Sequence, residues 1–216
     1  MWIRDSIPRS VPGARALLYG YDSNLLANDS FQTISDIAQA FILHLKSGGW
    51  NLPSSKPIVF LAHSLGGLVL KEAIVQMADR EKSVAQILDH VLGAIMFGVP
   101  SLGMDQSHLL SMVEGRPNEQ LVQDLARDGG ANYVRQLNTR FQGLTFLRTA
   151  KVIWAYETKE SPTVIVGSTS ETLLVPVNPP SSFRNGRMAH GEDLVILQYL
   201  SIPTQRHATT IEETDL

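Results

Sequence analysis

The sequence predicts an α/β domain in which a mostly parallel sheet is flanked by helices. Short apolar runs alternate with amphipathic runs along the chain, and two of the apolar runs, 57–62 and 91–97, carry no charged residue. Both have the length of a strand and the composition of strands that are buried on both faces of a parallel sheet. Helical patterns between such runs are typical of parallel strands joined by crossovers.

The remaining elements follow the same criteria. The run 14–21 is apolar, short and followed by polar turn residues, which predicts a strand. Apolar residues at helical spacing predict helices over 31–46, which ends at a Gly-Gly pair, and over 67–80. His108 falls in a stretch without a regular pattern. Later in the chain, helices are predicted at 118–127, 132–144 and 192–200, strands at 151–156 and 163–167, and a loop at 175–186.

The composition restricts the classes of function. With 216 residues, 44% of them hydrophobic, the chain can form one domain, which we place at 1–202 with a polar tail at 203–216. A net charge of −3 gives no electrostatic argument for a nucleic-acid partner. The chain has no cysteine, metal-ligand spacing or phosphate-binding loop, so no metal or cofactor is predicted. Neither a membrane-spanning run nor a signal peptide is recognisable.

The segment AHSLGG, residues 62–67, is the strongest chemical signal. It places Ser64 between a predicted buried strand and a predicted helix, which is the context of a nucleophile elbow. Ala62 and Gly66 provide the small flanking residues that this sharp turn requires. The turn would direct the backbone N–H of Leu65 and the helix N-terminus toward a developing oxyanion. The alternative interpretation is a serine that only caps the helix.

A serine nucleophile needs a base and an orienting acid. Among six histidines, His190 is the predicted base because it follows the strand candidates, and α/β-hydrolases have the chain order serine, acid, histidine. Glu157 directly follows the predicted strand 151–156 and is the predicted acid. Both could instead be ordinary exposed residues. The alternatives for the acid are Glu160, Glu171 and Asp193.

The chain resembles the serine active site-containing protein family of lipase-like α/β-hydrolases. The resemblance rests on AHSLGGLVLKEAIV at 62–75 and on further segments: WIRDSIP at 2–8, ARALLYGYDSN at 14–24, LGAIMFGVP at 92–100 and TAKVIWAYE at 149–157. It covers about residues 1–200. Fungal relatives often carry this domain ahead of NACHT, ankyrin or tetratricopeptide regions.

The resemblance implies an ester hydrolase of the lipase or esterase type with a Ser-His-Glu triad and no cofactor. Its substrate would be an ester or lipid-like small molecule. It also implies an intracellular protein, either cytoplasmic or peripherally associated with membranes of the mitochondrion or endoplasmic reticulum. The residues predict no particular oligomeric state.

Two departures from the family pattern give an alternative function. The first is VPSLG at 99–103, which stands where the family has T-P-H-R-G, and the second concerns the N-terminal part. The His190 loop matches the family's segment before the last helix, with Ala189 where an aspartate is usual. The family's first three strands, with an H-G-L-G-G oxyanion loop, precede the part that matches here. By the family's strand order, 14–21 and 57–62 would flank an empty position, and would either pair directly or leave 14–21 poorly held. The alternative is a non-catalytic interaction or sensing domain, or a gene-model fragment.

Overall fold

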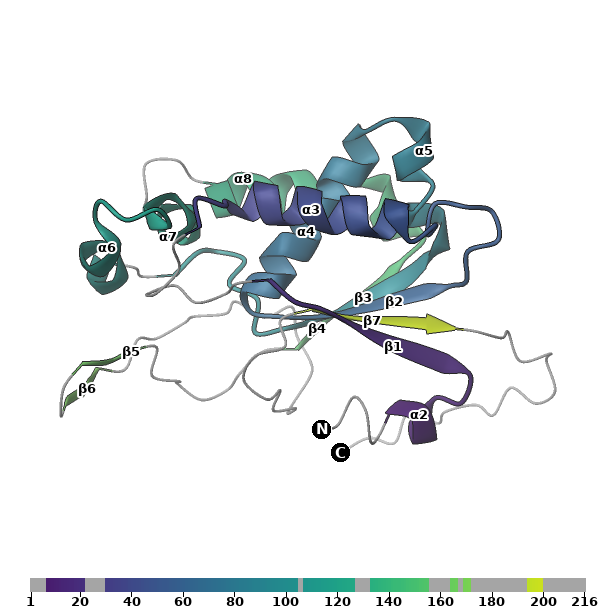
Figure 1. The fold of residues 1–216 in the computed structure, drawn as a ribbon, viewed down its shortest axis with the longest axis horizontal. Coiled ribbons are helices and arrows are strands. Elements are labelled where there is room, and N and C mark those ends of the chain that lie inside the picture. Colours follow the sequence, from purple (N-terminus) through teal and green to yellow (C-terminus); the bar gives the residue numbers. More distant parts are fainter. Residues whose placement is uncertain are drawn as a thin grey trace.

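In a computed structural model, the chain is described for residues 7–21, 30–104, 107–126, 133–155, 164–166, 169–171 and 194–199. Its centre is a five-stranded sheet with the order β1-β7-β2-β3-β4. Figure 1 shows that the long helices lie against one face of this sheet, while the short helix α2 (Ile7–Ser10) lies on the other side. The strands are β1 (Ala14–Tyr19), β2 (Ile58–His63), β3 (Val91–Phe97), β4 (Lys151–Ala155) and β7 (Leu194–Tyr199), and a separate pair is β5 (Val164–Val166) and β6 (Thr169–Glu171).

Three strands form the predicted parallel part of the sheet. β2, β3 and β4 are neighbours in sequence order, and Ala62, Met96 and Trp154 lie in one row across them. The helices between them are in the predicted places, which confirms the α/β class. The helices of the covered face and its margins are α3 (Ile34–Ser47), α4 (Leu65–Asp79), α5 (Lys82–Ala85), α6 (Ser107–Val113), α7 (Glu119–Leu125) and α8 (Tyr133–Gln142), with 3₁₀ turns at Leu88–His90 and Thr145–Arg148.

The last strand shows that two predictions were wrong. Within the segment predicted as a helix over 192–200, residues 194–199 form β7, which lies between β1 and β2 and is antiparallel to both. The position that was expected to be empty is therefore filled, and β1 and β2 do not pair directly. A strand at this position gives the backbone N–H and C=O groups of β1 and β2 hydrogen-bond partners, which a helix would leave without any. This tertiary pairing outweighs the helical pattern of the segment.

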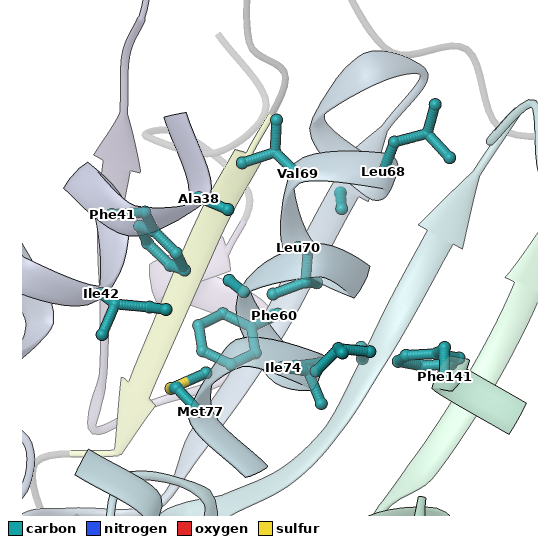
Figure 2. Packing of buried hydrophobic residues seen from close by; sticks show 14 of the residues in the cluster. Ala38, Phe41, Ile42, Phe60, Leu68, Val69, Leu70, Ile74, Met77 and Phe141 are labelled. Carbon is teal, nitrogen blue, oxygen red and sulfur yellow. The ribbon is translucent and has the colours of Figure 1, made fainter. Parts of the chain in front are cut away.

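The hydrophobic core lies between the helices and the covered face of the sheet. Phe41 of α3 and Phe60 of β2 are fully buried, and their rings meet edge to face with centroids 5.9 Å apart. Figure 2 shows α4 at the centre of this packing, with Ile74 and Met77 near Phe60 and with Phe141 of α8 beside them. Because α4 is buried on most sides, its position and that of its first residue are fixed by the core.

Local signals account for the ends of α3, whereas the helix α6 was not predicted. Thr33 and Asp36 form a reciprocal capping box at the start of α3, and Gly48 follows its last residue. The stretch that contains His108, expected to be irregular, includes the helix α6. None of the helices in the described ranges combines the length and hydrophobicity needed to cross a bilayer.

Candidate active site

Ser64 has the backbone conformation that a nucleophile elbow requires. It lies between the last residue of β2 and the first residue of α4, with φ 49° and ψ −122°. Among the described residues other than glycine, it alone has a positive φ. This conformation costs about 1–3 kcal/mol and persists only where the surroundings enforce it. Here the Ser64 N–H donates to the Phe97 carbonyl at 2.9 Å, and the Gly67 N–H donates to the Ser64 carbonyl at 3.0 Å.

The Ser64 side chain does not cap the helix that it precedes. Its hydroxyl makes no capping hydrogen bond with α4, although Ser64 occupies the N-cap position, and the residue is partly exposed. The interpretation of Ser64 as a simple helix cap is therefore wrong. The first N–H groups of a helix, including that of Leu65, have no acceptor within the helix and carry the positive end of its dipole. An oxyanion that forms on a substrate bound at the Ser64 hydroxyl would lie next to these donors.

Small residues allow the elbow to pack closely on its surroundings. Ala62, two residues before Ser64, is fully buried, and Gly66, two residues after it, is also buried. At Gly67, an added Cβ would lie 2.1 Å from a methyl carbon of Val99, so no side chain fits there. Val99 belongs to the loop that follows β3. The first turn of α4 is thus pressed directly against this loop, and the strand, sharp turn and helix together form an α/β-hydrolase-like arrangement.

The other two predicted triad members, His190 and Glu157, lie outside the described residues, so their roles stay predictions. The strand ends nearest to them can be placed. β4 ends at Ala155, which is in the same row as Phe97 and His63. β7 begins at Leu194, which pairs with Ala62. The chain therefore leaves β4 and enters β7 at the edge of the sheet that carries Ser64.

Of the three alternative acids, two lie outside the described residues and one lies within them. Glu160 and Asp193 lie outside the described residues. Glu171 is described as the last residue of β6, paired with Val164 in the separate two-stranded sheet. That sheet shares no described strand pairing with the five-stranded one.

A buried lysine close to this edge was missed by the sequence analysis. Lys71 of α4 is fully buried, and its Nζ donates to Ser101 Oγ at 2.6 Å and to Asn138 Oδ1 at 3.0 Å. The Nζ also lies 4.6 Å from the centre of the Trp154 ring. Burial lowers the pKa of Lys71 to about 7. The sequence signal was a lysine within the apolar run LVLKEAIV, two helical turns after Ser64.

The chain has limited similarity to known proteins in sequence and in structure. A search of protein families finds no match. The chain is 25% identical over 185 residues to the zebrafish (Danio rerio) protein SERAC1; this covers 82% of the present chain and 27% of the length of SERAC1. Among solved structures, it is similar to the Bacillus licheniformis lipase BlEst2 in mature form, with a TM-score of 0.41 and 13% identity over 57% of this chain and 47% of the lipase. The chain thus spans about a quarter of the curated relative that it matches.

Proposed function

We propose that this protein is a serine ester hydrolase of the lipase or esterase type, with an ester or lipid-like small molecule as its substrate. The observation that carries the proposal is the left-handed backbone of Ser64 at the junction of β2 and α4. Strained non-glycine residues of this kind are concentrated at functional sites. A strand, a strained serine and a helix in succession are the arrangement that exposes a serine nucleophile at the top of a sheet.

In the proposed reaction, the Ser64 hydroxyl attacks the carbonyl carbon of the ester. His190 accepts the hydroxyl proton and then donates it to the leaving alcohol, and Glu157 holds the imidazole in the required tautomer. The negative charge that forms on the carbonyl oxygen is stabilised by the Leu65 N–H at the start of α4. Water then releases the acyl group by the same steps in reverse order.

Chain reach supports these two partners for Ser64. Glu157 is two residues beyond Ala155, and an extended chain of that length spans up to about 7 Å. His190 is four residues before Leu194, and an extended chain of that length spans up to about 14 Å. The strands that carry these ends are one or two positions from β2, and neighbouring strands are separated by about 4.8 Å. These lengths are compatible with the proposed roles of Glu157 and His190 as partners of Ser64.

A fluorophosphonate probe tests the nucleophile. The purified chain is treated with the probe, digested, and the labelled peptide identified by mass spectrometry. We expect an adduct on Ser64 that is lost in Ser64→Ala and retained in the matched control Ser47→Ala, whose serine lies on an exposed part of α3. An unlabelled Ser64 in folded protein would contradict the proposal.

The base and acid are tested by the rate of the same labelling. General-base catalysis contributes about 10²–10⁴-fold, so His190→Ala should slow labelling by a factor in that range. Glu157→Gln should also slow it, while Glu160→Gln, the control at an alternative acid, should leave the rate near that of the wild type. The opposite order for the two glutamate variants would move the acid to Glu160.

The second candidate is a non-catalytic interaction or sensing domain. It is favoured by β7, an antiparallel strand that occupies the position where the family resemblance expects a parallel strand from the upstream part that also holds the oxyanion loop. Loss of one oxyanion donor typically costs about 10²–10³-fold in rate. If fusion of an upstream H-G-x-G segment produced no hydrolysis and Ser64 remained unlabelled, this candidate would replace the hydrolase.

A further inference from the structure

We propose that Ser101 is a second nucleophilic serine, with Lys71 as its general base, and that it accepts acyl groups from activated esters. The proposal is independent of Ser64 because it rests on a different hydroxyl and a different base. The Nζ of Lys71 lies 2.6 Å from Ser101 Oγ, within the 2.6–3.2 Å that join an activated nucleophile to its base. Serine-lysine pairs are an established variant of the serine triad.

The surroundings of Lys71 favour the neutral amine, which is the form that can accept a proton. The side chain is fully buried, and the described groups in contact with its Nζ are uncharged: Ser101, Asn138 and the rings of Phe141 and Trp154. Burial alone lowers the pKa of Lys71 to about 7. Near neutral pH a large fraction of the amine is therefore unprotonated, as in lysines that serve as general bases.

Asn138 supplies the third group of such an arrangement. Its Oδ1 accepts a hydrogen bond from Nζ at 3.0 Å, and Asn138 lies on α8, which packs against α4. With one N–H directed at Asn138, the neutral amine can direct its lone pair at the Ser101 hydroxyl. Asn138 thus orients the base in the way that the acid orients the histidine of a triad.

The loop after β3 holds Ser101 between the buried lysine and the surface. Ser101 is partly exposed, whereas the base beneath it is buried. The loop is fixed on both sides of Ser101, since Val99 packs on Gly67 and the Gly103 N–H donates to the Pro100 carbonyl at 3.0 Å. We expect a small molecule to approach the hydroxyl from the exposed side of the loop, with the lysine remaining in the core.

The proposed step is balanced. Ser101 Oγ forms a bond to the acyl carbon, and its proton passes to the neutral Nζ of Lys71. The bond between the acyl carbon and the leaving oxygen then breaks, and the leaving alcohol takes the proton from the ammonium group. With a fluorophosphonate, the new bond is from Oγ to phosphorus and fluoride departs, while the proton stays on Nζ.

Labelling of Ser64→Ala protein with a fluorophosphonate tests the proposal, because the first candidate nucleophile is then absent. We expect an adduct on Ser101, found by peptide mass spectrometry, whose rate of formation rises from about pH 6 to about pH 9 with a midpoint near the lysine pKa. The double variant Ser64→Ala/Lys71→Met should label at least about 10²-fold more slowly, and Ser64→Ala/Ser47→Ala should label at the unchanged rate.

Two results would overturn the proposal. One is an unlabelled Ser101 throughout this pH range in folded Ser64→Ala protein. The other is unchanged labelling after Lys71→Met, which would give Lys71 a purely structural role. If Lys71→Met does not fold, the pH profile of Ser101 labelling decides alone, and a profile without a rise near neutral pH rejects the base. If Ser64 of the wild-type protein were not labelled, the labelling expected at Ser101 would be unchanged.

Discussion

The two halves of the sheet are assembled in different ways. β2, β3 and β4 are parallel, follow one another in the sequence and are connected through helices on one face. β1 and β7 come from opposite ends of the described chain and pair antiparallel. β2 is the strand at which the two halves meet, and Ser64 follows it directly. The candidate nucleophile therefore follows a strand of the half that local sequence specifies. The strand β7 on one side of β2 depends on a long-range pairing.

The largest expected effect is on the strand shared by both halves. Phe60 of β2 is fully buried against Phe41, so Phe60→Ala should lower the free energy of unfolding by about 3–5 kcal/mol. Urea titration followed by far-UV circular dichroism measures this loss. The control Leu52→Ala removes a half-exposed side chain and should change stability by about 0.5 kcal/mol or less. Equal losses in the two variants would place Phe60 outside the core.

A proline in β7 should separate the two halves. Ile196 pairs with Leu17 on one side and with Phe60 on the other. Ile196→Pro removes one backbone N–H from this ladder and should cost about 1–3 kcal/mol for the partner left unpaired. In hydrogen exchange, we expect β1 and β7 to lose protection while β3 and β4 keep theirs.

Ile196→Val, which keeps the N–H and the β-branched side chain, is the matched control and should preserve protection in β1. Unchanged protection of β1 in the proline variant would mean that β7 does not hold it. Uniform loss across all five strands would mean that the halves are one cooperative unit.

The buried lysine should give the parallel half a pH-dependent stability. The pKa of Lys71 is about 7 in the folded chain against an ordinary value of 10.5. Between these two values the unfolded chain binds more protons, so stability should rise with pH, by up to about 1.4 kcal/mol per pH unit. Lys71→Met should lack this contribution. Urea titrations of both proteins above neutral pH measure the two slopes, and parallel slopes would contradict the lowered pKa.

The smallest expected effect concerns the start of α3. The Asp36 N–H donates to Thr33 Oγ1 at 3.2 Å, and the Thr33 N–H donates to Asp36 Oδ2 at 2.9 Å. Thr33→Ala should therefore lower stability by about 1 kcal/mol, and Thr33→Ser should retain most of it. Thermal unfolding of the three proteins compares these values. If alanine and serine were equivalent, the capping hydroxyl would contribute nothing.

The parallel half could be predicted because each of its signals is local. The charge-free runs at 57–62 and 91–97 have the composition of buried strands, and the small residues around Ser64 indicate the elbow. β7 could not be predicted in the same way. Its sequence LVILQY also fits a helix, and the contacts that make it a strand are with β1, at the other end of the described chain.

The contact of Lys71 with Ser101 could not be predicted for a similar reason. The lysine was visible as a charge within an apolar run, but its partners are on the loop after β3 and on α8. Those partners are brought to Lys71 by the packing of α4 against α8 and by the close contact of Val99 with Gly67. Only the assembled fold shows that this buried amine faces a hydroxyl rather than a carboxylate.

A crystal structure of the fluorophosphonate adduct tests the central claim, that Ser64 is an elbow nucleophile, most directly. We expect the phosphorus to be bonded to Ser64 Oγ, with one phosphonyl oxygen accepting a hydrogen bond of about 2.7–3.1 Å from the Leu65 backbone N–H. The φ of Ser64 should remain positive. An adduct oxygen directed away from the start of α4, or a Ser64 without an adduct in fully treated protein, would contradict the account.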